Sequence, residues 1–174
     1  LDLRGVHLFA GTQILDEAVL LAQWLHGIDV AGRVAAIAGR ALKTIDLGGG
    51  LGIPHFCGDD QLDLTELSAG LPALRQKLKS NPLLAEARLV VEPGRFLAGP
   101  AGIYVAAVNA AKTSRGTRFL VTDGGMHHHL AASGNLGQII KRDYPILAPA
   151  RMNEADASPV TIAGPLCTPL DTLA

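Results

Sequence analysis

The sequence predicts an α/β fold in which parallel strands alternate with helices. Three short apolar segments are typical of buried strands, namely residues 5–10, 44–47 and 88–91. Glycines or polar residues follow each segment directly, at 11–13, 48–50 and 92–95. Functional loops of parallel sheets lie at the carboxyl ends of the strands, so these three positions are the first candidates for a site.

Two helices are predicted between these strands. Apolar residues of the first repeat at the i, i+3, i+4, i+7 spacing of one helix face: Ala18, Leu21, Ala22 and Leu25. The same pattern returns at 34–41, and Gly32 between the two patterns is a candidate break or cap. The second helix, near 68–80, has leucines at 71, 74 and 78 inside and stops at Asn81-Pro82.

The pattern changes near residue 99. Residues 103–111 and 118–121 are rich in strand formers, with a turn at 113–116 between them, and 158–163 is a late strand. We predict that 99–174 is part of an antiparallel β domain. A complete eight-fold βα barrel takes roughly 250 residues. We therefore expect 1–98 to be the second half of a (β/α)8 barrel, with the first half outside this chain.

Composition narrows the class of protein. The 174 residues are 48% apolar and carry 15 basic and 16 acidic side chains, a net charge of −1, which gives no reason to expect nucleic acid or an anionic membrane as partner. The apolar runs are shorter than the roughly 20 residues of a membrane helix. Cys57 and Cys167 form no disulfide framework, which favours a reducing, cytoplasmic setting. A start at Leu1, without Met or signal peptide, suggests a fragment.

Two of the strand-end loops have the chemistry of an anion site. The glycines at 48–50 and 52 let backbone N–H groups approach an anion closely, but they match neither a dinucleotide fingerprint nor a P-loop. A tight turn without ligand is the alternative. Glu92 and Arg95 flank the turn Pro93-Gly94, so a carboxylate could hold a protonated ring nitrogen and an arginine a phosphate. The alternative there is a salt-bridged turn.

Two polar clusters lie in the second half. Asp123-Gly124-Gly125 precedes three histidines at 127–129, but adjacent side chains on an extended segment point to opposite faces, so we predict no metal site. One or two of these histidines are expected to line a pocket or a subunit contact. Cys167, on the turn Gly164-Pro165, is a candidate acid or nucleophile, with a half-buried structural cysteine as the alternative.

In combination, five segments in order resemble the fold-type III decarboxylases that use pyridoxal phosphate, a family that includes diaminopimelate, ornithine and arginine decarboxylases. The segments are GVHLFAGTQ, DLGGGLGIP, EPGRFLAGPAG, VTDGGMHHHL and GPLCTPLD. The stretch 123–145 is most similar to decarboxylases of amino acids tethered to an acyl-carrier protein and to exosortase-linked decarboxylases. The resemblance implies a pyridoxal phosphate cofactor at a barrel mouth, a β domain beside it, and a head-to-tail homodimer with shared active sites.

The resemblance also implies roles for individual residues around the cofactor. Thr12, Gly49, Gly50 and Arg95 fall where the family holds the phosphate, and Glu92 where it pairs with the pyridine nitrogen. Phe9 stands where the family has a histidine stacked on the ring; a phenylalanine can stack there but cannot hydrogen-bond.

Further roles concern the substrate. Cys167 matches a cysteine that the partner subunit inserts into the site, and Asp171 an aspartate that contacts substrate; both are expected to be catalytic. His7, Asp123 and His127 are expected in the substrate pocket. Thr168 replaces an acidic residue that recognises a distal amino group, which argues against diaminopimelate or a diamine precursor as substrate and suits a neutral or tethered far end.

The lysine that carries the cofactor in this family would precede Leu1, and none of the lysines here, at 43, 77, 79, 112 and 141, has the family's lysine context. We therefore expect decarboxylation by the whole protein and not by this chain alone. An alanine-racemase-like enzyme is an alternative, although racemases lack the cysteine motif. A catalytically inactive homologue that binds another protein is the other alternative.

Overall fold

The computed structural model describes residues 2–136, 140–154 and 158–174. The chain divides into two compact units, Leu1–Gly102 and Ile103–Ala174, and each is described by itself.

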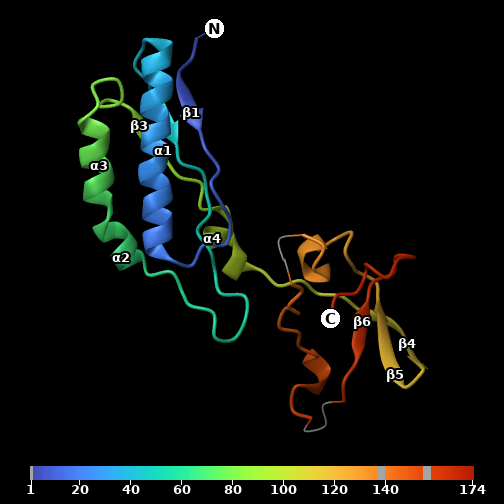
Figure 1. Cartoon of the computed structure of the whole chain (residues 1–174). Helices are drawn as coiled ribbons and strands as arrows, with labels where there is room; N and C mark the ends of the chain where they lie inside the picture. Colours follow the sequence, from blue (N-terminus) through green and yellow to red (C-terminus); the bar gives the residue numbers. More distant parts are fainter. Residues whose placement is uncertain (1, 137–139, 155–157) are drawn as a thin grey trace. The chain divides into compact units, whose positions relative to one another are not determined.

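The first unit is built on a three-stranded parallel sheet in the order β1-β2-β3 (Figure 1). The strands are β1 (Gly5–His7), β2 (Thr44–Asp46) and β3 (Arg88–Val90). Gly5 is in register with Thr44, and Thr44 with Arg88. The predicted α/β alternation is confirmed, because a helix or helix pair follows each of the first two strands.

Helix α1 (Glu17–Ala38) connects β1 to β2 as one continuous rod. The Asp16 side chain caps its start by accepting from Val19 N at 2.9 Å, and Gly39, with φ of 63°, ends it in the left-handed conformation. The buried stripe consists of residues 20, 24, 27, 28, 31 and 35. The predicted face was right in part: Leu21 and Leu25 pack against the core, whereas Ala18 and Ala22 are exposed. In the second pattern Ile37 is 89% exposed. This helix is apolar on nearly every side, so periodicity alone cannot select the packed stripe.

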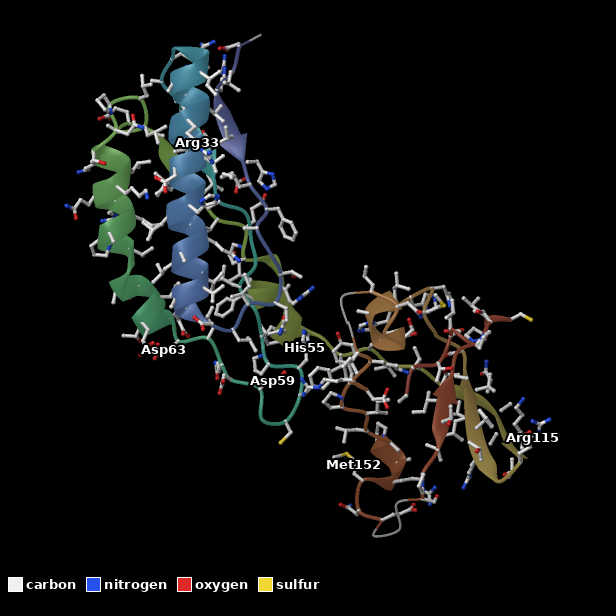
Figure 2. The ribbon with its side chains drawn as sticks, in the orientation of Figure 1. Arg33, His55, Asp59, Asp63, Arg115 and Met152 are labelled. Carbon is white, nitrogen blue, oxygen red and sulfur yellow. The ribbon has the colours of Figure 1, made fainter. Side chains whose placement is uncertain are left out.

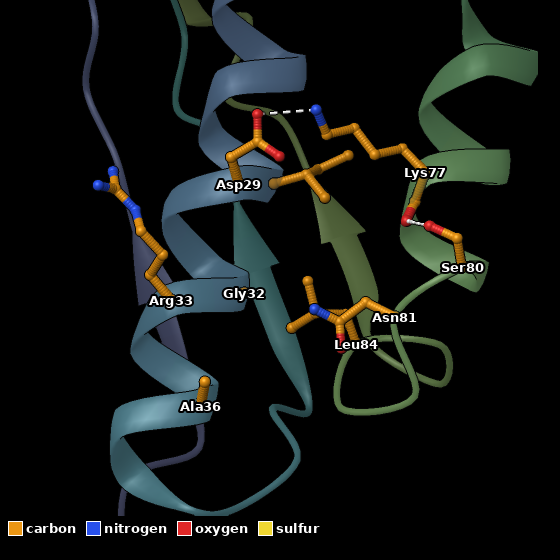
Figure 3. Close-up of a pocket in the computed structure, with 9 residues that line it drawn as sticks. Asp29, Gly32, Arg33, Ala36, Lys77, Ser80, Asn81 and Leu84 are labelled. Atoms are coloured by element: carbon orange, nitrogen blue, oxygen red, sulfur yellow. Dashed lines mark hydrogen bonds and ion pairs between the residues drawn. The ribbon is translucent and has the colours of Figure 1, made fainter.

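Gly32 neither breaks nor caps α1. It lies in the helix interior opposite Asn81 and Leu84, as Figure 3 shows. A Cβ at Gly32 would lie 2.9 Å from Asn81 Nδ2, so the missing side chain lets the segment after α3 (Leu71–Lys79) come close to α1. An ion pair of 2.7 Å between Asp29 and Lys77 joins the same two helices.

The cavity in Figure 3, about 380 Å³, is lined by residues of α1 and α3 and by the segment between α3 and β3. It is not lined by the loops that follow the strands.

The helix predicted near 68–80 is two helices, α2 (Leu64–Ala69) and α3, which meet at Gly70. Leu74 and Leu78 are buried as expected, whereas Leu71 is 40% exposed. The Asp63 side chain accepts from the backbone N–H of Thr65 at 2.7 Å and caps α2 at its start (Figure 2). The backbone N–H of Thr65, followed by that of Glu66, holds the pKa of Asp63 below its ordinary value. A short helix, α4 (Gly94–Ala98), follows β3.

The second unit contains a three-stranded sheet in the order β4-β5-β6. Strands β4 (Val108–Ser114) and β5 (Thr117–Thr122) form an antiparallel hairpin whose turn has positive φ at Arg115 and Gly116. Strand β6 (Thr161–Ala163) pairs with β5 in parallel, so the prediction of an antiparallel domain was wrong for this strand. The long connection through 123–160 lets the chain return in the same direction, which a tight hairpin cannot do.

Irregular structure fills that connection. Two 3-10 turns, η2 (Leu130–Ser133) and η3 (Pro149–Arg151), lie within it, and a further one, η1 (Gly99–Ala101), follows α4. The sequence also has a possible helical period near 136–140, and residues 137–139 of it lie outside the described residues. Over the part of the chain that the structure describes, no helix is both long and apolar enough to span a lipid bilayer.

Candidate functional site

The loops that follow β1, β2 and β3 enclose one cavity of about 260 Å³. Its lining residues are Phe9, Thr12, Gly49, Gly50, Leu51, Glu92, Gly94 and Arg95. All six residues that the resemblance assigns to the cofactor are among them. The volume is slightly below the roughly 300–1,000 Å³ of typical small-molecule pockets.

Glycines bring the three loops together. Gly48 has φ of 71°, and a Cβ there would collide with the carbonyl oxygen of Leu8. A Cβ on Gly49 would lie 2.6 Å from the carbonyl oxygen of Glu92. The glycine loop is therefore packed between its two neighbours with no space for side chains. Glu92 N donates to Gly48 O at 2.8 Å, which fixes the turn that carries the carboxylate.

Gln13 links two of these loops to the arginine of the third. Arg95 Nη1 donates to Gln13 Oε1 at 3.1 Å, while Gln13 Nε2 donates to the carbonyl of Ile53. The backbone N–H of Ile53 donates to Gln13 Oε1 at 3.4 Å. Gln13 itself has a backbone φ of 56°, which is unusual for a residue other than glycine. Sequence reasoning left Gln13 out of the site, although it follows Thr12 in the same motif.

His7 lies beside the cavity and contacts Glu92. Its Nε2 is 3.3 Å from Glu92 Oε2, and both side chains are about half exposed. His7 is not among the residues that line this cavity, and its expected place in the substrate pocket stays a prediction. Ligand atoms of His7, Asp46 and Glu92 all lie within 4.8 Å of one another. Among the described residues this is the grouping close enough to share a cation, and the sequence did not predict it.

Asp171 is the centre of the polar cluster in the second unit. The side chain is 1% exposed, and its carboxylate accepts from Met126 N at 2.6 Å and from Leu166 N at 2.9 Å. Each carboxylate oxygen therefore already accepts a backbone N–H, and the expected contact of Asp171 with substrate stays a prediction. The carboxylate joins the turn before His127 to the turn before Cys167.

The other predicted residues of this unit lie near these turns. Cys167 is exposed with a free thiol, and Thr168 is half-buried, with its carbonyl accepting from Asp171 N at 3.2 Å. Asp123 is exposed and accepts from Ala107 N at 2.8 Å. The exposed ring of His127 packs on that of His128, with centroids 4.0 Å apart. Cys167 thus presents a free thiol at the surface of this unit.

Comparison with known proteins gives the family. Residues 14–174 match the family described as pyridoxal-dependent decarboxylase, C-terminal sheet domain. The chain is 34% identical over 172 residues to the L-glutamyl-[BtrI acyl-carrier protein] decarboxylase of Niallia circulans, covering 97% of this chain and 40% of that protein. It is 32% identical over 176 aligned residues to the diaminopimelate decarboxylase of Mycobacterium leprae, covering 96% of this chain and 36% of that protein.

The fold agrees with the sequence relatives. The crystal structure of diaminopimelate decarboxylase from Helicobacter pylori complexed with L-lysine matches with a TM-score of 0.71 at 23% identity, over 98% of this chain and 39% of that one. The chain thus spans about two fifths of the length of the proteins it matches. Since the match to the family extends over nearly every residue from 14 onward, the chain belongs to the pyridoxal-dependent decarboxylase family.

Proposed function

We propose that the whole protein containing this chain removes CO2 from an amino acid, with pyridoxal phosphate bound in the cavity formed by the loops after β1, β2 and β3. One observation carries the proposal. Three loops from distant parts of the sequence converge so that the six residues matching the family's cofactor positions line a single cavity. The residues present fit the chemical groups of this cofactor.

The phosphate end is matched by Arg95, Thr12 and the glycine loop. Arg95 supplies a guanidinium that forms strong, charge-assisted bonds to phosphate oxygens. Thr12 adds a hydroxyl, and the loop around Gly49 offers backbone N–H groups with no side chain in the way. Gln13 holds Arg95 in place through its bond of 3.1 Å.

Glu92 and Phe9 fit the pyridine ring of the cofactor. When bound, pyridoxal phosphate supplies an electron-accepting ring that takes up the charge left on the α-carbon as CO2 departs. Glu92 keeps the ring nitrogen protonated and so strengthens that capacity. His7 steadies Glu92 through the contact of 3.3 Å, and Phe9, whose side chain is 68% exposed, offers an apolar face for stacking.

Cys167 is the proposed proton donor. A general acid must return a proton to the α-carbon after CO2 has left, and an exposed thiol can supply it. Following the resemblance, this thiol comes from the partner subunit of a homodimer with shared sites.

The proposed substrate is an amino acid tethered to a carrier protein. The relative at 34% identity acts on an L-glutamyl group on an acyl-carrier protein. Thr168, at the position where the family often has an acid, supports a substrate without a distal amino group. We further propose that 1–98 is the second half of a (β/α)8 barrel, that 99–174 is part of the C-terminal β domain, and that the protein is cytoplasmic.

The test is CO2 release by the whole protein with pyridoxal phosphate, over a panel of free amino acids and the same amino acids loaded on an acyl-carrier protein. Release from tethered substrates supports both parts of the proposal. Release from free amino acids alone keeps the reaction and removes the carrier. The proposal is contradicted if the parent binds the cofactor but releases no CO2 from any substrate, and if Glu92→Gln does not differ from the parent in either measurement. That outcome favours a racemase or a non-catalytic homologue.

A further inference from the structure

A buried carboxylate organises the turns of the second unit. Asp171 is 1% exposed, and its two oxygens accept from backbone N–H groups on two separate segments: Oδ1 from Met126 at 2.6 Å and Oδ2 from Leu166 at 2.9 Å. Burial of a charged side chain is costly unless its hydrogen bonds are satisfied. The two short bonds provide this compensation.

Two glycines shape the space around this carboxylate. A Cβ on Gly125 or on Gly164 would collide with the carboxylate oxygens of Asp171. Both glycines are buried. The site is therefore a cradle made of two N–H donors and two side-chain-free walls, and it fits a carboxylate group closely.

The cradle closes the turn that carries Cys167. Leu166, whose N–H is held by Oδ2, directly precedes the cysteine, and Gly164 N donates to the Asp171 carbonyl at 2.8 Å. On the other side, Asp171 N donates to the Thr168 carbonyl at 3.2 Å. The segment 164–171 is thus tied back on itself through one side chain and its backbone.

We propose that Asp171 is a positioning residue that fixes the direction of the Cys167 thiol, and that it does not contact substrate. Its carboxylate locks the cysteine turn to the turn at Gly125, so that the thiol is presented in one orientation. The proposal rests on the proposed function for the role of Cys167 as proton donor. Misplacing a reacting group by about 1 Å costs on the order of 100-fold in rate.

The first experiment measures the order of the turn without using activity. In this chain, Cys57→Ser leaves Cys167 as the single cysteine, and a nitroxide label on Cys167 reports the mobility of the turn. Asp171→Ala is expected to increase label mobility. Formate, which has the size and charge of the missing carboxylate, is expected to restore it by binding the vacated N–H donors.

A second variant and a control keep the test interpretable. Asp171→Asn fills the same space but turns an amide NH2, which cannot accept a hydrogen bond, towards one of the two backbone donors. The label on this variant should be mobile, and formate should not change its mobility because the space is already filled. Glu154→Ala removes an exposed carboxylate of the same unit whose partner is Arg151 in η3, and it should change nothing. A label equally immobile in Asp171→Ala and Asp171→Asn overturns the proposal, as does a mobile Asp171→Ala label that formate does not restore.

The second experiment measures kinetics in the whole protein. Asp171→Ala is expected to lower kcat on the order of 100-fold, with KM nearly unchanged, and formate should recover part of kcat. An unchanged kcat in an active parent overturns the positioning role. If the parent has no decarboxylase activity while the label still responds to formate, the proposed function fails and the cradle stands, so the two failures are distinguishable.

Discussion

His7 and Glu92 contact each other across the sheet, with 3.3 Å between Nε2 and Oε2, although β2 lies between β1, which ends at His7, and β3, which precedes Glu92. The contact passes over the end of β2, where Asp46 lies. With the tautomer that carries its proton on Nε2, His7 donates to the carboxylate. The orientation of Glu92 therefore depends on the far edge of the sheet as well as on its own loop.

His7→Ala is expected to weaken binding of pyridoxal phosphate to the whole protein by about three- to tenfold, because a half-exposed hydrogen bond to a charged group contributes modestly. His7→Gln, which can place an amide donor near the position of Nε2, should retain most of the affinity. Fluorescence titration of the cofactor-free protein measures both. His26→Ala changes an exposed histidine of α1 and serves as control. Equal affinities for His7→Ala and the parent would contradict the role of His7.

Gln13→Glu is expected to weaken phosphate binding more than Gln13→Ala does. The new carboxylate would pair with Arg95, whose Nη1 now lies 3.1 Å from Gln13 Oε1, and would compete with a phosphate for the guanidinium. Calorimetric titration with pyridoxal phosphate measures the difference. Gln61→Glu adds the same charge on an exposed loop and should leave affinity unchanged. Comparable affinities for Gln13→Glu and Gln13→Ala would show that Arg95 does not hold the phosphate.

Gly49→Ala is expected to destabilise the first unit by about 1–3 kcal/mol, the usual cost of overpacking. Its Cβ would lie 2.6 Å from the carbonyl oxygen of Glu92, which is backbone and cannot move aside. Urea unfolding measures the loss. Gly102→Ala is the matched control, because a Cβ there meets no atom within 4 Å. Equal midpoints for the two variants would show that the loops after β2 and β3 can separate freely.

Cys167→Ala is expected to slow decarboxylation by about 100- to 10,000-fold, the usual contribution of a general acid. Cofactor affinity should stay constant, because the cavity proposed to hold the cofactor is lined by residues of the first unit. Cys57→Ala removes the other exposed cysteine and should leave the rate unchanged. A Cys167→Ala enzyme with the rate of the parent would exclude the thiol as proton donor.

Asp63→Ala is expected to lower thermal stability in a pH-dependent manner. The folded state holds the pKa of Asp63 below its ordinary value, chiefly through the backbone N–H of Thr65, so the charged cap stabilises the fold above the ordinary aspartate pKa of about 3.9. That contribution declines as the pH falls below this value and is lost once the folded carboxylate is protonated. Melting curves between neutral and acidic pH measure the gap between Asp63→Ala and the parent, which should close in acid. A gap that is constant with pH would refute the charge effect.

The convergence of the three strand-end loops could be predicted because it follows from one rule, whereas the cofactor roles of their residues came from the family resemblance. Carboxyl ends of parallel strands meet at one edge, so loops far apart in sequence, such as those with Thr12 and Arg95, come together once the strands are recognised. The structure brings these residues into one cavity, while their roles remain predictions. Gln13 was missed because its contacts are to the backbone of Ile53 and the side chain of Arg95, partners that no local pattern displays.

Other features depend on tertiary packing that the sequence does not display. Gly32 looks like a helix break, but its lack of a side chain serves the approach of Asn81. The direction of β6 depends on the long connection before it. Asp171 matches a functional aspartate by spacing, and only the positions of Met126 N and Leu166 N reveal that its oxygens are already occupied.

The cavity of the first unit also couples ligand binding to folding. Its walls come from residues 9–12, 49–51 and 92–95, so the binding surface exists only after all three strands have paired. A ligand that binds there and not to the unfolded chain shifts the folding equilibrium by mass action, by about 2.7 kcal/mol at a hundred times its Kd. The melting temperature of this unit therefore serves as a binding assay that needs no turnover, and any ligand of this cavity would raise the folded fraction of the unit.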